Sequence, residues 1–80
     1  MTTIIIPPAL AQAINATWRA IAPDAAEFCE SNIEAVEIVL DANRLSTFGY
    51  PEAEAMVKVL IKEHGLVKVY KHLAKHFNFI

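Results

Sequence analysis

The stretch LVKVYKHLAKHF, residues 66–77, repeats hydrophobic side chains at three- and four-residue spacing, which is the period of an α-helix. The side chains predicted to face the protein interior are Leu66, Val69, Tyr70, Leu73 and Phe77. The opposite side is predicted to be basic, and it carries Lys68, Lys71, His72, Lys75 and His76. The stretch therefore predicts an amphipathic helix with one buried and one cationic side.

A second helix is predicted directly before it, over residues 51–64. Pro51 suits the first turn of a helix, because the N–H that proline lacks has no partner there in any case. Gly65 suits the end of the helix, because glycine readily adopts the positive φ angles found there. The predicted inner face consists of Ala53, Met56, Val57, Leu60 and Ile61.

Residues 25–42 predict a helix of the opposite charge. Asp24 is the expected N-cap, and Glu27 three residues later completes a capping-box pattern. The predicted apolar side carries Phe28, Cys29, Ile33, Val36, Val39 and Leu40. The polar side carries an acidic stripe of Glu27, Glu30, Glu34, Glu37 and Asp41. A break at Ser31–Asn32 is the alternative, since Ser31 and Glu34 form a second capping-box pattern, but the stripe continues in phase and favours one helix.

The remaining segments complete a four-helix pattern. Residues 8–21 predict the first helix, which Pro23 is expected to end. Residues 1–7 predict an extended apolar arm. Residues 43–50 predict an irregular connection anchored by its apolar side chains, Leu45, Phe48 and Tyr50. We therefore expect an all-α, compact four-helix domain with short connections over residues 1–80, with an apolar N-terminal extension.

Size and composition favour self-association. A core formed by 80 residues rarely supplies more than about 3–5 kcal/mol of stability without a further source. Cys29 is the only cysteine, so no disulfide forms within one chain, and 55% of the residues are hydrophobic. We expect a homodimer or higher oligomer. The N-terminus lacks the basic region of a signal peptide and no segment is apolar enough to span a membrane, so a cytoplasmic protein is expected.

Known catalytic and metal-binding patterns are not found. His72 and His76 lie one helical turn apart, but a zinc site needs at least one further ligand. Cys29 falls on a predicted apolar face, where a thiol is normally unreactive. Two glycines, Gly49 and Gly65, are too few for a phosphate-binding loop. The sequence predicts no enzymatic activity, no metal or cofactor and no small-molecule substrate.

The charge pattern favours binding to a protein. Residues 1–50 carry two arginines and six acidic side chains, a net charge of −4, whereas residues 51–80 carry five lysines and three glutamates, a net charge of +2. We expect a non-catalytic interaction module that acts as a regulator, accessory factor or inhibitor of a larger machine, with a phage or another mobile element as a candidate source of the protein. The predicted partner-binding residues are Glu27, Glu30, Glu34, Glu37, Asp41, Lys68, Lys71, His72, Lys75 and His76.

Two alternatives and one open question accompany this expectation. Residues 51–77 also have the layout of a helix-turn-helix nucleic-acid-binding motif, whose phosphate contacts would come from Lys58, Lys62, Lys68, Lys71 and Lys75. However, residues 66–77 lack the Arg, Asn and Gln side chains that read base edges. Binding of the same helix to a membrane surface is disfavoured, since its apolar side is needed for the core. Whether the apolar ends, residues 4–6 and 77–80, fold back or contact a partner stays open.

Overall fold

The computed structural model describes residues 3–25, 27 and 29–79, and all regular elements in this part of the chain are helices. The elements are α1 (Pro8–Ala25), α2 (Asn32–Val39), the 3₁₀-helix η2 (Asp41–Asn43), α3 (Arg44–Thr47), α4 (Pro51–His64) and α5 (Leu66–His76). The predicted all-α class is confirmed. Four helices is approximately the right number, because α3 is a single turn. The bounds of α4 are those predicted from Pro51 and Gly65.

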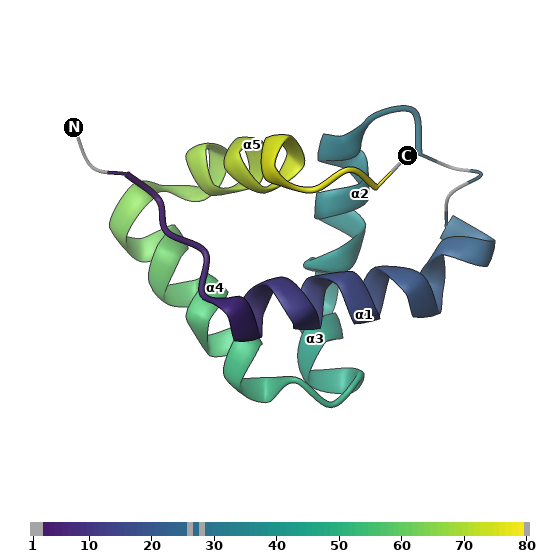
Figure 1. The fold of residues 1–80 in the computed structure, drawn as a ribbon, viewed down its shortest axis with the longest axis horizontal. Coiled ribbons are helices and arrows are strands. Elements are labelled where there is room, and N and C mark those ends of the chain that lie inside the picture. Colours follow the sequence, from purple (N-terminus) through teal and green to yellow (C-terminus); the bar gives the residue numbers. More distant parts are fainter. Residues whose placement is uncertain (1–2, 26, 28, 80) are drawn as a thin grey trace.

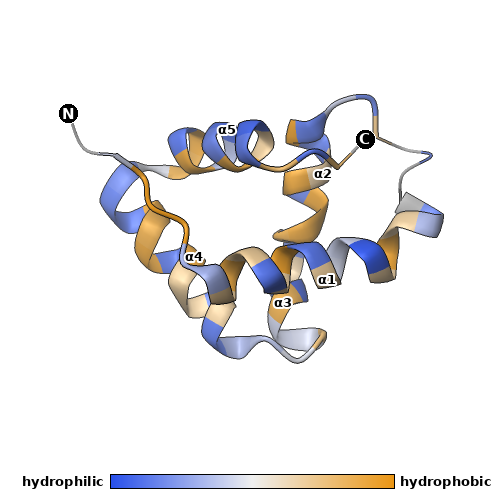
Figure 2. Ribbon diagram, viewed as in Figure 1, coloured by the Kyte–Doolittle hydropathy of each residue, from blue (hydrophilic) through white to orange (hydrophobic). Residues whose placement is uncertain are grey.

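The helices enclose one core. α1 lies across the front of the molecule, α4 and α5 meet at a corner, and α2 crosses behind α1 (Figure 1). α5 packs against both α2 and α4, and α1 packs against α2, α3 and α4. Figure 2 shows hydrophobic residues along the N-terminal arm and α2 as well as on α4 and α5. The buried apolar residues are Leu10, Ala13, Ile14, Trp18, Ala35, Val36, Val39, Leu45, Ala53, Val57, Val69, Leu73 and Phe77.

Helix α1 is longer than the sequence predicts. It continues through Pro23 to Ala25, whereas the expected end was residue 21. A proline removes the hydrogen bond of its own nitrogen and crowds the preceding turn, but the residues after it keep their own N–H donors. Pro23 therefore lies inside the last turn of α1, and Asp24 belongs to α1 rather than capping the next helix.

Helix α2 is much shorter than the predicted helix over residues 25–42. Ser31 is its N-cap, with an extended backbone (φ −147°, ψ 162°), so the chain breaks at the alternative position, Ser31–Asn32. The Oε2 atom of Glu34 accepts a hydrogen bond of 2.9 Å from the backbone N–H of Glu30. The predicted capping contact therefore forms one residue earlier than the pattern implies. Phe28, assigned to the apolar side, lies outside the described residues.

The connection over residues 43–50 is more regular than predicted. It contains the single turn α3, and Leu45 at its centre is fully buried. Before it, Ala42 (φ 44°, ψ 47°) and Asn43 (φ 58°) adopt left-handed conformations and separate α3 from α2 by a kink. Of the predicted anchors, Tyr50 is half-buried, whereas Phe48 is 42% exposed and anchors little.

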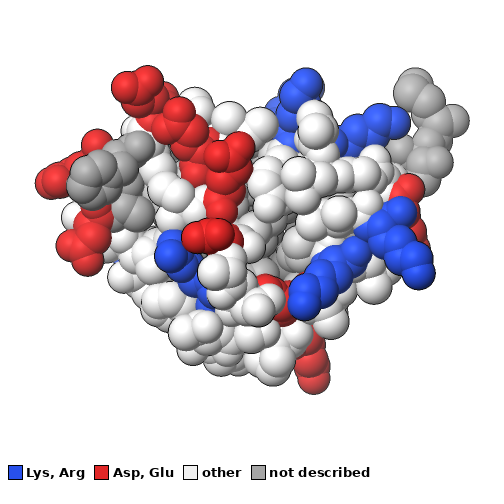
Figure 3. All heavy atoms as spheres, turned by 180° about the vertical axis from the view of Figure 1, so that it is seen from behind, with Lys and Arg blue, Asp and Glu red and all other residues white. Residues whose placement is uncertain are grey.

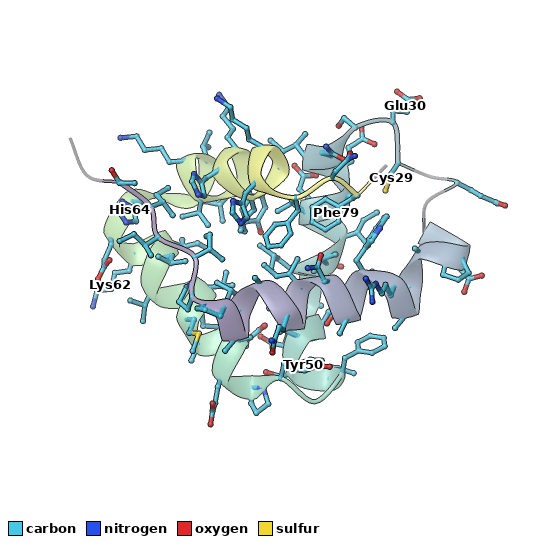
Figure 4. The ribbon with its side chains drawn as sticks, viewed as in Figure 1. Cys29, Glu30, Tyr50, Lys62, His64 and Phe79 are labelled. Atoms are coloured by element: carbon cyan, nitrogen blue, oxygen red, sulfur yellow. The ribbon has the colours of Figure 1, made fainter. Side chains whose placement is uncertain are left out.

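Both described ends of the chain fold back onto the helices. In the N-terminal arm, Ile4 and Ile6 pack against the core while Ile5 points outward and is 75% exposed. At the other end, the Phe79 side chain lies between α1 and α2 (Figure 4). Ile80 lies outside the described residues. Among the described residues, the apolar ends therefore pack mainly against helices of the same chain.

Candidate functional site

A surface groove runs between α2 and the first turns of α5. We call it the α2–α5 groove. Its volume is about 550 Å³, and its lining residues are Ile33, Glu37, Leu40, Asp41, Ala42, Leu66, Val67 and Tyr70. Leu66 and Val67, at the α5 edge, are 51% and 60% exposed. Large apolar side chains this exposed beside a hollow are typical of a contact surface.

The opposite edge of the groove is acidic. Glu37 comes from α2 and Asp41 from η2, and both are exposed. Tyr70 lies between the two edges and is half-buried. Burial raises the pKa of the Tyr70 hydroxyl above its ordinary value, and the negative charges of Glu37, Asp41 and Glu54 raise it further. The groove therefore combines apolar surface with a negative potential.

A second, smaller hollow continues this surface onto α4. Its volume is about 210 Å³, and Leu40, Ala42 and Tyr70 line both hollows. Its remaining lining residues are Asn43, Glu54, Val57, Lys58 and Ile61. Glu54 is almost completely buried, whereas Lys58 is exposed. The accessible charge therefore changes sign along this face, from acidic at α2 to basic at α4.

The predicted acidic stripe does not lie on one helix. Glu34 and Glu37 belong to α2, Glu27 and Glu30 precede it, and Asp41 follows it in η2. The groove brings Glu37 and Asp41 together. Glu34 is engaged by the backbone of Glu30. Glu30 and Cys29 lie in the connection before α2 (Figure 4).

The lysines of α4 and α5 point to solvent. Lys58, Lys62, Lys68, Lys71 and Lys75 are all exposed. Seen from behind, acidic side chains gather mainly on the half of the molecule that contains α2, and basic side chains mainly on the half that contains α4 and α5 (Figure 3). Uncharged surface lies between the two halves.

The two histidines of α5 interact with each other. The rings of His72 and His76 stack with centroids 5.9 Å apart and an interplanar angle of 11°. The His76 ring also contacts the edge of Phe77, at 4.9 Å between centroids. His72 is half-buried and His76 is exposed. Neither residue lines the α2–α5 groove.

Sequence reasoning missed the apolar edge of the groove. It assigned Leu66 to the buried side of its helix, which is wrong, and it gave Val67 no role. A signal for this edge was present, because the spacing that assigned Leu66 to the interior left the adjacent Val67 outside the predicted apolar side. Val67 was therefore recognisable as an apolar side chain on the outer side of this helix.

Several other kinds of site find no support among the described residues. In residues 3–25, 27 and 29–79, no three His, Cys, Asp or Glu side chains gather so as to hold a metal ion. The Cys29 thiol is half-buried, and burial together with the charge of Glu34 raises its pKa, which disfavours the reactive thiolate. No helix in this part of the chain has the length and hydropathy of a membrane span.

Comparisons with known proteins leave the site to be interpreted from its own geometry. Neither the protein-family models nor the curated proteins nor the solved structures contain a significant match to this chain.

Proposed function

We propose that this chain is a non-catalytic protein–protein interaction module and that the α2–α5 groove is its binding surface. Its role is that of a regulator, accessory factor or inhibitor of a larger assembly. One observation carries the proposal: Leu66 and Val67 are more than half exposed at the edge of a hollow. The opposite edge of that hollow carries Glu37 and Asp41.

The chemistry of the groove indicates the kind of protein segment that it binds. Covering exposed apolar surface contributes about 25 cal/mol for each Å² removed from water, which favours an apolar side chain against Val67. Glu37 and Asp41 attract positively charged groups and repel acidic ones, so they contribute mainly to partner selection. The preferred segment therefore carries apolar side chains next to Lys or Arg.

A random-peptide display library tests this proposal. The protein is immobilised at low density, bound peptides are selected, and each peptide is measured again against Val67→Asp and Val59→Asp. Val59 is a matched control, since it is 53% exposed on α4 and lines neither hollow. We expect apolar and basic peptides whose affinity falls at least about tenfold with Val67→Asp and little with Val59→Asp. Failure to enrich peptides, or equal affinity for both variants, would refute the proposal.

Nucleic-acid binding is the second candidate function, supported by five exposed lysines on α4 and α5. Fluorescence anisotropy with labelled DNA and RNA duplexes tests it directly. Binding by this surface should weaken steeply with salt, because each phosphate contact releases counterions. It should also be lost in the triple variant Lys68→Ala, Lys71→Ala and Lys75→Ala. Absence of binding at physiological salt would eliminate this candidate.

A further inference from the structure

We propose that the segment occupying the α2–α5 groove comes from a second copy of this chain, in a twofold-symmetric dimer. This inference rests on the proposed function, since it names the partner of the same groove. In such a dimer each copy presents the same surface to the other, so the surface must be complementary to itself.

The surface of this chain itself carries exposed apolar side chains next to lysines, which is the combination that the groove is proposed to bind. Leu66 and Val67 are exposed and apolar. Lys71 follows Val67 by four residues and therefore lies on the same side of α5, one turn further along. Lys58 lines the neighbouring hollow on α4. An apolar segment next to two exposed lysines is thus available on the very face that contains the acidic edge.

The distribution of charge fits one orientation of the two copies. On the face shown in Figure 3, acidic and basic side chains occupy mainly opposite halves, with uncharged surface between them. A twofold axis that lies in the plane of this face, between the two halves, places the acidic half of each copy over the basic half of the other. Glu37 and Asp41 of one copy then face Lys58 and Lys71 of the other. The apolar residues around Tyr70 meet at the centre.

The molecule has enough accessible surface for an interface of ordinary size. An ordinary stable interface buries about 800 Å² on each partner. The accessible surface of the molecule is 5205 Å², so such an interface covers a modest share of it. The arrangement also follows the usual anatomy of interfaces, in which an apolar centre is surrounded by a polar rim.

Sedimentation equilibrium over a range of protein concentrations tests the inference, at about 50 mM and about 500 mM NaCl. We expect a monomer–dimer equilibrium that weakens at the higher salt concentration, because the rim contacts are between opposite charges. The acidic-rim variant combines Glu37→Lys with Asp41→Lys, and the basic-rim variant combines Lys58→Glu with Lys71→Glu. Each variant alone places like charges opposite each other and should raise the dimer dissociation constant at least about tenfold.

Mixing the two variants provides the decisive measurement. In an equimolar mixture, the reversed acidic rim of one chain faces the reversed basic rim of the other, so a heterodimer should form at close to wild-type affinity. The control for the acidic-rim variant combines Asp24→Lys with Glu52→Lys, which makes the same change in net charge as that variant at exposed positions lining neither hollow. This control should dimerise like the wild type. Circular dichroism verifies that every variant is folded.

Two results would overturn the inference. The first is a wild-type protein that stays monomeric at all concentrations, and the second is a dimer that the rim variants leave unchanged or that their mixture does not restore. The peptide selection separates this failure from failure of the proposed function. If the protein is a monomer but binds peptides in a Val67-dependent way, the interaction function stands and the partner is a different protein. If the protein neither dimerises nor binds peptides, the proposed function is refuted as well.

Discussion

The indole Nε1 of Trp18 donates a hydrogen bond of 3.2 Å to the backbone carbonyl oxygen of Phe79, 61 residues further along the chain. The two rings also meet edge to face, with centroids 5.3 Å apart. The backbone N–H of Phe79 donates a hydrogen bond of 3.1 Å to Oδ1 of Asn32, which begins α2. One residue near the end of the chain is thus bound to the first two helices.

We expect Phe79→Ala to reduce the free energy of unfolding by about 1–2 kcal/mol, through loss of apolar burial and of the ring contact with Trp18. Urea denaturation followed by far-ultraviolet circular dichroism measures this change. Phe48→Ala is the matched control, because Phe48 is 42% exposed and its removal should change stability little. Equal effects of the two substitutions would show that the Phe79 contact contributes nothing specific.

We expect Thr17→Val to stabilise the protein by about 1 kcal/mol. Thr17 is completely buried in α1, and its hydroxyl oxygen has no hydrogen-bond partner among the described residues. Valine has a similar shape and removes the desolvated hydroxyl group. Thr17→Ser is the comparison, since it keeps the hydroxyl and loses a methyl group, and it should destabilise. Thermal unfolding measures both, and a lower melting temperature for Thr17→Val than for the wild type would contradict the argument.

Gly65 separates α4 from α5 with φ 91° and ψ 148°, a conformation that residues with a Cβ atom rarely adopt. We expect Gly65→Ala to destabilise by about 1–3 kcal/mol through backbone strain. Apart from Gly65 and its two chain neighbours, no heavy atom of the described residues lies within 4 Å of the position of the added Cβ, so a steric clash with distant residues is not the cause. Ala55→Gly gives the contrasting case of an exposed position within α4 and should cost about 0.5–1 kcal/mol. If Gly65→Ala proves neutral in urea denaturation, the backbone angles are not a constraint.

Stability should fall at alkaline pH because the folded state raises the pKa of the Tyr70 hydroxyl above its ordinary value of 10.0. Below that pH the hydroxyl is neutral in both states and no stability is lost. Above it the unfolded state releases the proton first, so unfolding becomes more favourable until the folded state also ionises. Urea denaturation at a series of pH values measures this slope, and Tyr70→Phe should reduce it. An unchanged slope in Tyr70→Phe would assign the effect to other groups, of which Cys29 is one.

The sequence predicted the elements whose ends are set by local chemistry. Pro51 and Gly65 have strong preferences at helix ends, and they delimit α4 as expected. Most of the predicted interior positions of α5, such as Val69, Leu73 and Phe77, are buried. These predictions succeeded because a single amphipathic period determines which side of a helix is buried.

The prediction of one helix over residues 25–42 failed because it relied on the helical spacing of the side chains and neglected the repulsion between the acidic ones. Glu27, Glu30 and Glu34 at helical spacing repel one another, and the predicted helix has no basic side chain that would relieve them. The chain leaves Glu27 and Glu30 outside α2 and uses Glu34 to hold the start of the helix. The left-handed backbone conformations of Ala42 and Asn43 could not be predicted either, since alanine seldom adopts positive φ angles.

The groove was hidden from sequence reasoning for a different reason. Its residues come from α2, η2 and α5, and only the packing of α5 against α2 brings Val67 close to Glu37 and Asp41. The sequence shows the charge of each of these side chains, but it does not show the distances between them in the folded protein.

The contact between Trp18 and Phe79 also gives the molecule a built-in optical reporter. Trp18 is the only tryptophan, so all indole fluorescence comes from a ring that contacts Phe79 in the segment after α5. Emission therefore reports the docking of that segment, while backbone ellipticity reports helix formation. Stopped-flow refolding with both signals can resolve whether the helices assemble before this segment docks or together with it.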